Sequence, residues 1–155
     1  MITRAEFAEL AKKYVGYPSV LYRGRTRGIG PSGFNCSGFL YFLLKRAEIP
    51  NPEDLRHCSE FFDRLGVAVH YECVDYGDLV FFSSSGLAPN HVGIMASPTE
   101  YVHSPGRNGA KVCISELKFK GISRHSLDQL YGTNPIGFKR LSIPSGRYQK
   151  ILEKI

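Results

Sequence analysis

The spacing of hydrophobic and polar positions changes after residue 66. Before it, apolar residues recur at helical intervals, which predicts helices over residues 3–15, 36–47 and 57–65. After it, they form short runs typical of strands, at residues 67–71, 79–82, 91–95, 101–103, 112–114 and 135–141. The run at 79–82 is apolar on both faces and therefore predicts a central strand. Helices followed by antiparallel strands predict an α+β fold.

Local signals mark where the predicted helices begin and end. Thr3 and Glu6 have the spacing of a capping box, and Gly16 and Pro18 end the first helix. The second helix begins at Cys36, directly after a loop rich in Gly, Arg and Ser at residues 19–35. Such a long loop in a compact domain is often functional.

Length and composition indicate one ordinary globular domain. The chain has 155 residues, of which 43% are hydrophobic, and it shows no repeat or linker, so we expect a single domain over residues 1–155. No apolar run approaches the roughly 18 residues of a membrane span. No signal peptide is recognisable at the N-terminus. We therefore expect a cytoplasmic chain, unless a leader has been removed or a dedicated system exports the folded protein.

Charge and cysteine usage exclude several classes of function. The net charge is +6, but the basic residues are scattered, which favours a solvated basic surface over a nucleic-acid partner. None of the cysteines lies in a CxxC pair, so the sequence does not support a zinc ribbon or a thioredoxin motif. Because no leader is recognisable, we expect free thiols rather than disulfides. The four cysteines are Cys36, Cys58, Cys73 and Cys113.

Cys36 occupies a position where a thiol is easily activated. The segment 33–39, Gly-Phe-Asn-Cys-Ser-Gly-Phe, places it at the first turn of the predicted second helix. Free backbone N–H groups and the helix dipole favour a thiolate there, and the thiolate is the nucleophile. An isolated cysteine is more often a small buried apolar residue, so a nucleophile requires a base nearby.

Two of the five histidines are spaced so that they meet. His91 and His103 lie on consecutive predicted strands, and a turn centred on Ser97 places them directly opposite one another on one face. One imidazole then acts as the base and the other fixes its tautomer. A slip of one residue sends them to opposite faces. The order of cysteine helix before histidine sheet is that of papain-like enzymes.

Four motifs together resemble the NlpC/P60 family of cysteine peptidases. They are residues 33–39, 77–82 (Gly-Asp-Leu-Val-Phe-Phe), 91–94 (His-Val-Gly-Ile) and 101–104 (Tyr-Val-His-Ser). The resemblance extends from about residue 11 to residue 140. It implies a papain-like fold in which N-terminal helices, including the cysteine helix, pack on a central antiparallel sheet. It also implies Cys36 as nucleophile, His91 as general base and His103 as the third, orienting residue, with no metal or cofactor.

The sequence departs from the family pattern at two places. Asn35 stands where the family commonly has Asp, but Asn is an equally good N-cap and the helix should start normally. The family also has a Tyr that is thought to help stabilise the oxyanion. Tyr22 is expected in that role, with Tyr17 as the alternative, and Ser37 is expected to contribute to oxyanion or substrate binding.

The resemblance implies hydrolysis of cell-wall (peptidoglycan) stem peptides through a thioester, often between D-glutamate and a diamino acid. A peptidoglycan-derived peptide is therefore the expected partner. Three roles are compatible with it: recycling of wall peptides, a delivered toxin or phage component, and part of a longer wall-binding form. Two other classes remain open. One is a papain-like amidase or acyltransferase acting on a non-wall amide, lipid or protein, and the other is a non-catalytic binding domain.

Overall fold

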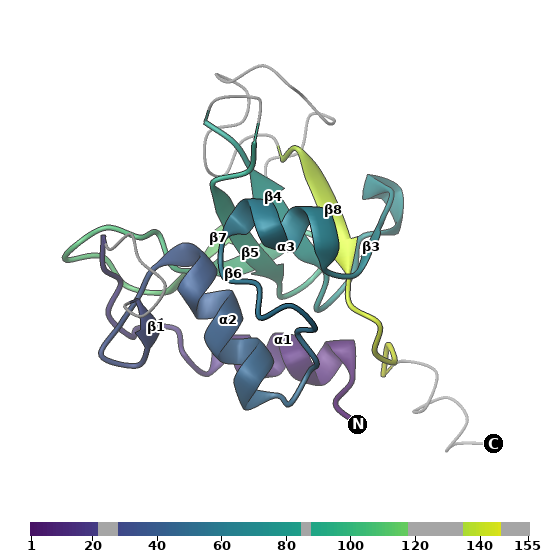
Figure 1. The fold of residues 1–155 in the computed structure, drawn as a ribbon, viewed down its shortest axis with the longest axis horizontal. Helices are drawn as coiled ribbons and strands as arrows, with labels where there is room; N and C mark the ends of the chain where they lie inside the picture. Colours follow the sequence, from purple (N-terminus) through teal and green to yellow (C-terminus); the bar gives the residue numbers. More distant parts are fainter. Residues whose placement is uncertain (22–27, 85–87, 118–134, 147–155) are drawn as a thin grey trace.

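The computed structural model describes residues 1–21, 28–84, 88–117 and 135–146. Within these residues, three α-helices precede a six-stranded antiparallel sheet along the chain (Figure 1). The helices are α1 (Arg4–Lys12), α2 (Cys36–Arg46) and α3 (Cys58–Arg64), with a 3-10 turn η1 (Tyr71–Cys73). The sheet has the order β3 (Val67–Ala68), β8 (Gly137–Arg140), β4 (Leu79–Phe82), β5 (His91–Met95), β6 (Glu100–His103) and β7 (Cys113–Glu116). The predicted α+β class is confirmed.

The helix starts follow the predicted caps. The Thr3 hydroxyl accepts a hydrogen bond from the Glu6 N–H at 3.1 Å, and the Glu6 carboxylate accepts one from the Thr3 N–H at 3.1 Å. Helix α1 ends at Lys12 rather than at the predicted Val15, because the next residues form tighter turns that close at Gly16, whose φ is +97°. Helices α2 and α3 agree with their predicted bounds to within one residue.

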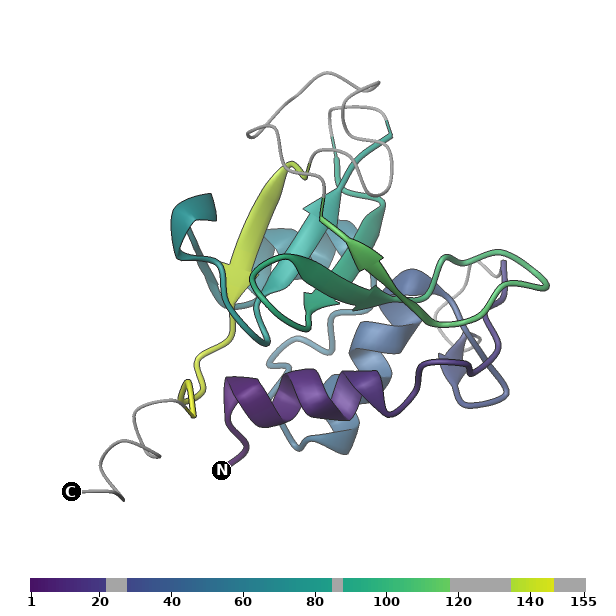
Figure 2. The same cartoon turned by 180° about the vertical axis from the view of Figure 1, so that it is seen from behind.

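The sheet separates two apolar layers. Helices α2 and α3 lie on one face of the sheet (Figures 1 and 2). On that face, side chains from β4 to β6 belong to the same buried apolar cluster as side chains of the two helices. The strand side chains are Leu79, Phe81, Val92, Ile94 and Val102. The other face carries a second cluster, formed by Val74, Val80, Phe82, Met95, Tyr101 and Phe138. Strand β4 is buried at all four positions between β8 and β5, which confirms it as a central strand.

A buried ion pair joins strand β8 to the residue that precedes β4. The Asp78 side chain is fully buried, and its two oxygens accept hydrogen bonds from Arg140 Nε and Nη2 at 2.9 and 2.8 Å. Asp78 also accepts a hydrogen bond from the Asp75 N–H at 2.9 Å. Its carboxylate raises the pKa of Arg140, against the opposing effect of burial. The pair therefore fixes the turn that leads into the central strand.

Two predicted segments differ from the observed structure. The strand predicted over residues 67–71 is only β3, because it is an edge strand paired with β8 alone and the chain then turns into η1. Within the predicted loop at 19–35, β1 (Ile29–Gly30) pairs with β2 (Gly33–Phe34) as a short hairpin. This hairpin brings the chain to the start of α2.

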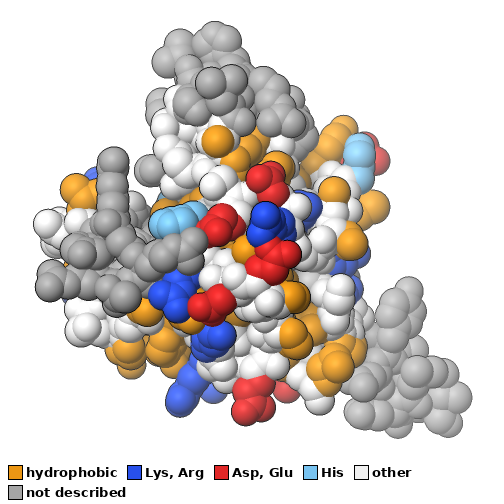
Figure 3. Space-filling view, viewed as in Figure 1, with side chains coloured by type: hydrophobic (Ala, Val, Ile, Leu, Met, Phe, Trp, Pro, Cys, Tyr) orange, Lys and Arg blue, Asp and Glu red, His pale blue; other side chains and the backbone are white. Residues whose placement is uncertain are grey.

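The described surface carries charges of both signs. Acidic and basic side chains alternate on the face that carries α2 and α3 (Figure 3). Asp54 illustrates the mixing, since it pairs with Lys45 at 3.3 Å and with Arg56 at 2.9 Å. Among the described residues, no helix is long and apolar enough to cross a membrane.

Candidate active site

Helix α2 begins at Cys36, as predicted. The Asn35 side chain accepts a hydrogen bond from the Gly38 N–H at 2.6 Å and so acts as the N-cap. Gly38 is required on steric grounds, because a Cβ at that position would collide with the backbone carbonyl of Gly28. The pattern Asn-Cys-x-Gly therefore caps the helix and lets the β1 hairpin lie against it.

His91 and His103 are in contact, although not through the predicted register. The observed pairs Ile94–Val102 and Met95–Tyr101 centre the turn on Pro98, so the prediction of a turn centred on Ser97 with directly opposed histidines is wrong. The difference moves the partner strand by two residues, which keeps both histidines on one face. They meet diagonally, with His91 Nε2 2.7 Å from His103 Nδ1.

His103 remains neutral and presents a single acceptor to His91. Its pKa is lowered to about 3, first by burial and then by the nearby charges of His91 and Arg107. A neutral His103 that accepts from His91 at Nδ1 carries its proton on Nε2. That nitrogen lies 2.8 Å from the Ser115 hydroxyl, which can accept the hydrogen bond. Ser115, on β7, is a site residue that the sequence analysis missed.

The Cys36 thiol lies between His91 and a second cysteine. Its sulfur is 3.5 Å from the Asn90 carbonyl and 3.7 Å from the sulfur of Cys58. The pKa of Cys36 is held well below its ordinary value, first by the hydrogen bond with Cys58 and then by the hydrogen bond and charge of His91. Burial opposes this shift, and the Ser37 backbone N–H adds to it. The surroundings therefore favour a thiolate at Cys36.

A buried network of hydroxyl groups connects the start of α2 with the end of β6. Ser104 Oγ lies 2.7 Å from the carbonyl of Phe34 and 2.8 Å from Ser19 Oγ. The Gly106 N–H donates to the same Ser19 oxygen at 2.7 Å. Phe34 lies two residues before Cys36, and Ser104 directly follows His103. The network therefore sets the distance between the thiol segment and the histidine strand.

The expected oxyanion and substrate residues lie in different settings. Tyr22 lies outside the described residues. Tyr17, the alternative, packs edge-on against Tyr14 with ring centroids 5.0 Å apart. The Ser37 hydroxyl lies 3.5 Å from Asn35 Oδ1 at the helix start, while its backbone N–H faces the Cys36 sulfur. The described part of the chain holds no group of three or more His, Cys, Asp or Glu side chains arranged to bind a metal ion.

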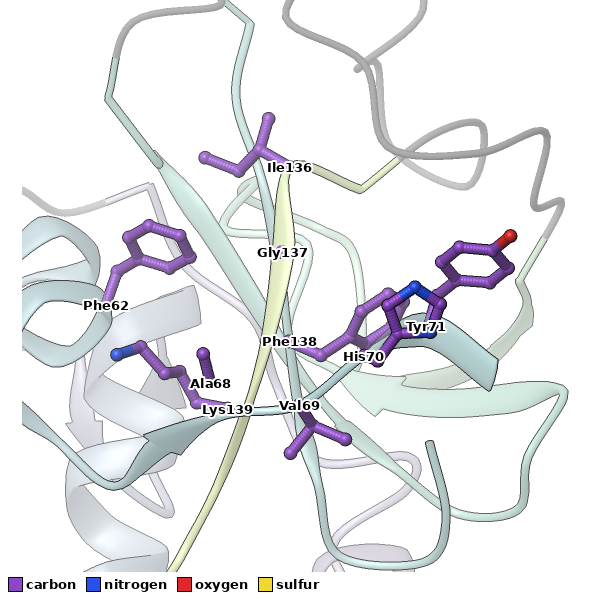
Figure 4. A pocket seen from close by; sticks show the side chains of 9 residues that line it. All are labelled: Phe62, Ala68, Val69, His70, Tyr71, Ile136, Gly137, Phe138 and Lys139. Atoms are coloured by element: carbon purple, nitrogen blue, oxygen red, sulfur yellow. The ribbon is translucent and has the colours of Figure 1, made fainter. Parts of the chain in front are cut away.

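A separate hollow lies at the other end of the sheet. It has a volume of about 430 Å³, and its lining includes Phe62 on α3 and Phe138 on β8. Figure 4 shows Phe62 and Phe138 on opposite sides of strand β8, with Tyr71 on the Phe138 side. None of Cys36, His91 and His103 lines this hollow, so it is distinct from the cysteine–histidine cluster.

Comparison with known proteins places this geometry in a family. The family model described as "NlpC/P60 family" matches residues 23–130. The chain belongs to the NlpC/P60 family. Its fold agrees with that of a crystal structure of an NlpC/P60 family protein from Bacillus cereus. The TM-score is 0.69 at 26% identity, over 90% of this chain and 40% of that one.

Two curated relatives are similar to this NlpC/P60 chain over parts of their length. A probable peptidoglycan endopeptidase, LytE of Bacillus subtilis, is 28% identical over 66% of this chain and 27% of its own. A gamma-D-glutamyl-L-lysine dipeptidyl-peptidase of Bacillus cereus is 32% identical over 61% of this chain and 26% of its own. The chain thus spans about a quarter of the length of these two relatives.

Proposed function

We propose that this chain is a cysteine peptidase that hydrolyses an amide bond through a thioester acyl-enzyme. The observation that carries the proposal is the unbroken series of contacts from Cys36 through His91 to His103 and Ser115. A nucleophile, a base and a group that orients the base are the three parts that nucleophilic acyl transfer requires. Residues 1–155 are proposed to form one catalytic domain, since α1 and the sheet share a single core.

In the first step the Cys36 thiolate attacks the amide carbonyl. The backbone N–H of Cys36, at the first turn of α2, faces the developing oxyanion in this proposal and stabilises it. His91 uses Nε2 to hold His103, so its Nδ1 is the atom that exchanges a proton with the thiol. It protonates the leaving amine and then deprotonates the water that hydrolyses the thioester.

The proposed substrate is a peptide stem of peptidoglycan, cut between D-glutamate and the diamino acid. This assignment is supported by family membership and by the activity in the name of the Bacillus cereus relative. Cys36, the first residue of α2, is partly exposed, as access for a peptide substrate requires.

The direct test is mass spectrometry of defined substrates incubated with the purified protein. The substrates are free tripeptide and tetrapeptide stems and intact wall. We expect cleavage after D-glutamate, with none by Cys36→Ala and normal cleavage by Cys73→Ala, which removes an exposed thiol elsewhere. Hydrolysis that survives Cys36→Ala would overturn the mechanism. Cleavage of a non-wall amide alone would favour the amidase or acyltransferase alternative.

Thiol alkylation separates the peptidase from a non-catalytic binding domain. At neutral pH, iodoacetamide should label Cys36 much faster than the exposed Cys73, because the lowered pKa of Cys36 supplies more thiolate. Equal labelling rates at these two cysteines would argue for the binding domain.

A further inference from the structure

The contact between Cys36 and Cys58 adds a second thiol to the series of Cys36, His91 and His103 that the proposed peptidase steps use. Cys58 is the first residue of α3 and its side chain is 5% exposed. Its sulfur lies 3.7 Å from that of Cys36, a residue 22 positions away in the sequence. The other two thiols differ: Cys73 is exposed on η1, and the sulfur of Cys113 lies 3.5 Å from His103 Nε2.

We propose that Cys36 and Cys58 form a redox-active pair, in which hydrogen peroxide oxidises Cys36 and Cys58 captures the product as a disulfide. The Cys36 thiolate attacks the peroxide, the O–O bond breaks, and a sulfenic acid and hydroxide form. The Cys58 sulfur then attacks the sulfenic sulfur, loses its proton and expels hydroxide, so that the second product is water. In total, two thiols lose two hydrogens and one peroxide becomes two waters.

The geometry permits this bond with limited movement. A disulfide has a sulfur–sulfur distance of about 2.0 Å, so the two sulfurs must approach by about 1.7 Å. Both cysteines are the first residues of their helices, where rotation of a short side chain moves the sulfur without changing the helix hydrogen bonds.

The electrostatics assign the two sulfurs different parts in the reaction. The lowered pKa of Cys36 makes it the thiolate that attacks peroxide. The pKa of Cys58 is raised, first by its hydrogen bond with Cys36, then by burial, and then by the Cys36 charge. Oxidation of Cys36 to a neutral sulfenic acid removes the first and third of these effects. The Cys58 thiol therefore becomes easier to deprotonate once Cys36 is a sulfenic acid, which is the group that Cys58 attacks.

The disulfide has two consequences for the site. It removes the nucleophile, and this loss of peptidase activity rests on the proposed function. Disulfide formation also protects the sulfenic acid from irreversible oxidation to sulfinic acid. This protection does not depend on any peptidase substrate. Reduction by a dithiol then returns both thiols.

The test follows the covalent state rather than activity. Reduced protein is treated with one molar equivalent of hydrogen peroxide, blocked with N-ethylmaleimide, digested and mapped by mass spectrometry. We expect a peptide pair joined through Cys36 and Cys58, lost on reduction with dithiothreitol. Sulfinic acid at Cys36 with no such joined pair, or a disulfide to Cys73 or Cys113 instead, would overturn the proposal.

Matched variants identify the residue that captures the sulfenic acid. Cys58→Ser removes the resolving thiol at nearly constant volume, and Cys73→Ser removes an exposed one. The Cys58→Ser variant should accumulate dimedone-reactive sulfenic acid at Cys36 and then sulfinic acid. Dithiothreitol should not restore the Cys36 thiol from the sulfinic acid. Cys73→Ser should behave as the unaltered protein. Because these readouts need no substrate, they remain decisive even if the peptidase assignment fails.

Discussion

His91 and His103 meet diagonally across strands β5 and β6, with Nε2 of the first 2.7 Å from Nδ1 of the second. Diagonal neighbours on one face are farther apart at Cβ than directly opposed residues, and long side chains are needed to close the gap. Two imidazoles are long enough to do so. The identity of residue 103 therefore decides whether His91 is held in the tautomer that the proposed mechanism uses to deprotonate Cys36.

His103, the proposed orienting residue, should matter because it supplies an acceptor atom to His91 rather than because it carries a charge. His103→Ala removes the acceptor for the His91 Nε2–H, and we expect kcat/KM to fall by about 100-fold. His103→Asn supplies an amide oxygen in its place and should lose no more than about tenfold. Steady-state kinetics on the cleaved stem peptide check both values. Equal losses for the two variants would contradict an orienting role.

Stability should depend on pH through His103. Its pKa is about 3 in the folded chain against an ordinary value of 6.5, so the unfolded chain binds more protons between these values. The stability contributed by neutral His103 is complete above pH 6.5 and is lost as the pH falls towards 3. From pH 7 to pH 5, the free energy of unfolding should drop by about 2 kcal/mol.

Urea unfolding at several pH values measures this dependence, and His103→Asn serves as its control. The variant cannot titrate at residue 103, so its stability should fall less steeply over the same range. If the free energy of unfolding fell equally steeply with pH in the unaltered protein and in His103→Asn, the pH dependence would come from other groups.

Ser115 is predicted to act on the reaction through His103. Ser115→Ala removes the hydroxyl acceptor of the His103 Nε2–H and leaves it the weaker sulfur acceptor of Cys113 at 3.5 Å, at a cost of about 1–3 kcal/mol, and so allows the ring to change tautomer. We expect kcat to fall by about tenfold with little change in KM, together with a shift in the pH profile of Cys36 alkylation. Ser115→Thr keeps the hydroxyl and should restore both. A loss of stability without either kinetic change would mean that Ser115 is only structural.

The Asp78–Arg140 pair should be structural rather than catalytic. Asp78→Ala leaves the Arg140 guanidinium without the carboxylate that accepts two of its hydrogen bonds, and we expect a loss of about 3 kcal/mol in the free energy of unfolding. Chemical denaturation measures the loss. At a temperature where the variant is folded, kcat should stay within about threefold of its original value. A much larger drop in kcat would place the pair in the reaction.

Much of the site could be predicted because its signals are local. The N-cap at Asn35 and the glycine at position 38 belong to one turn, and the sequence around them specifies that turn directly. The shared face of His91 and His103 survived a wrong turn centre because strands have a period of two. An error of one residue in register would have separated the two histidines.

Contacts that depend on packing between distant elements could not be predicted in this way. Cys58 reaches Cys36 because the first residue of α3 comes close to the first residue of α2, and no spacing along the chain specifies that approach. Ser115 lies on β7 diagonally across from His103, and its partner depends on the pairing register of β6 and β7. The short length of β3 also escaped prediction, since its apolar run does not show that it has only one neighbouring strand.

The hydroxyl network of Ser19 and Ser104 has a consequence for local unfolding. The segment at residues 17–20 lies between Phe34 and residues 110–112, and its backbone pairs with both sides. The segment before Cys36 therefore cannot detach while the chain beyond His103 stays in place. Opening this part of the molecule is one cooperative event, so the amides of Val20 and Val112 belong to a single hydrogen-exchange unit. Partial opening exposes the thiol and the end of the histidine strand together.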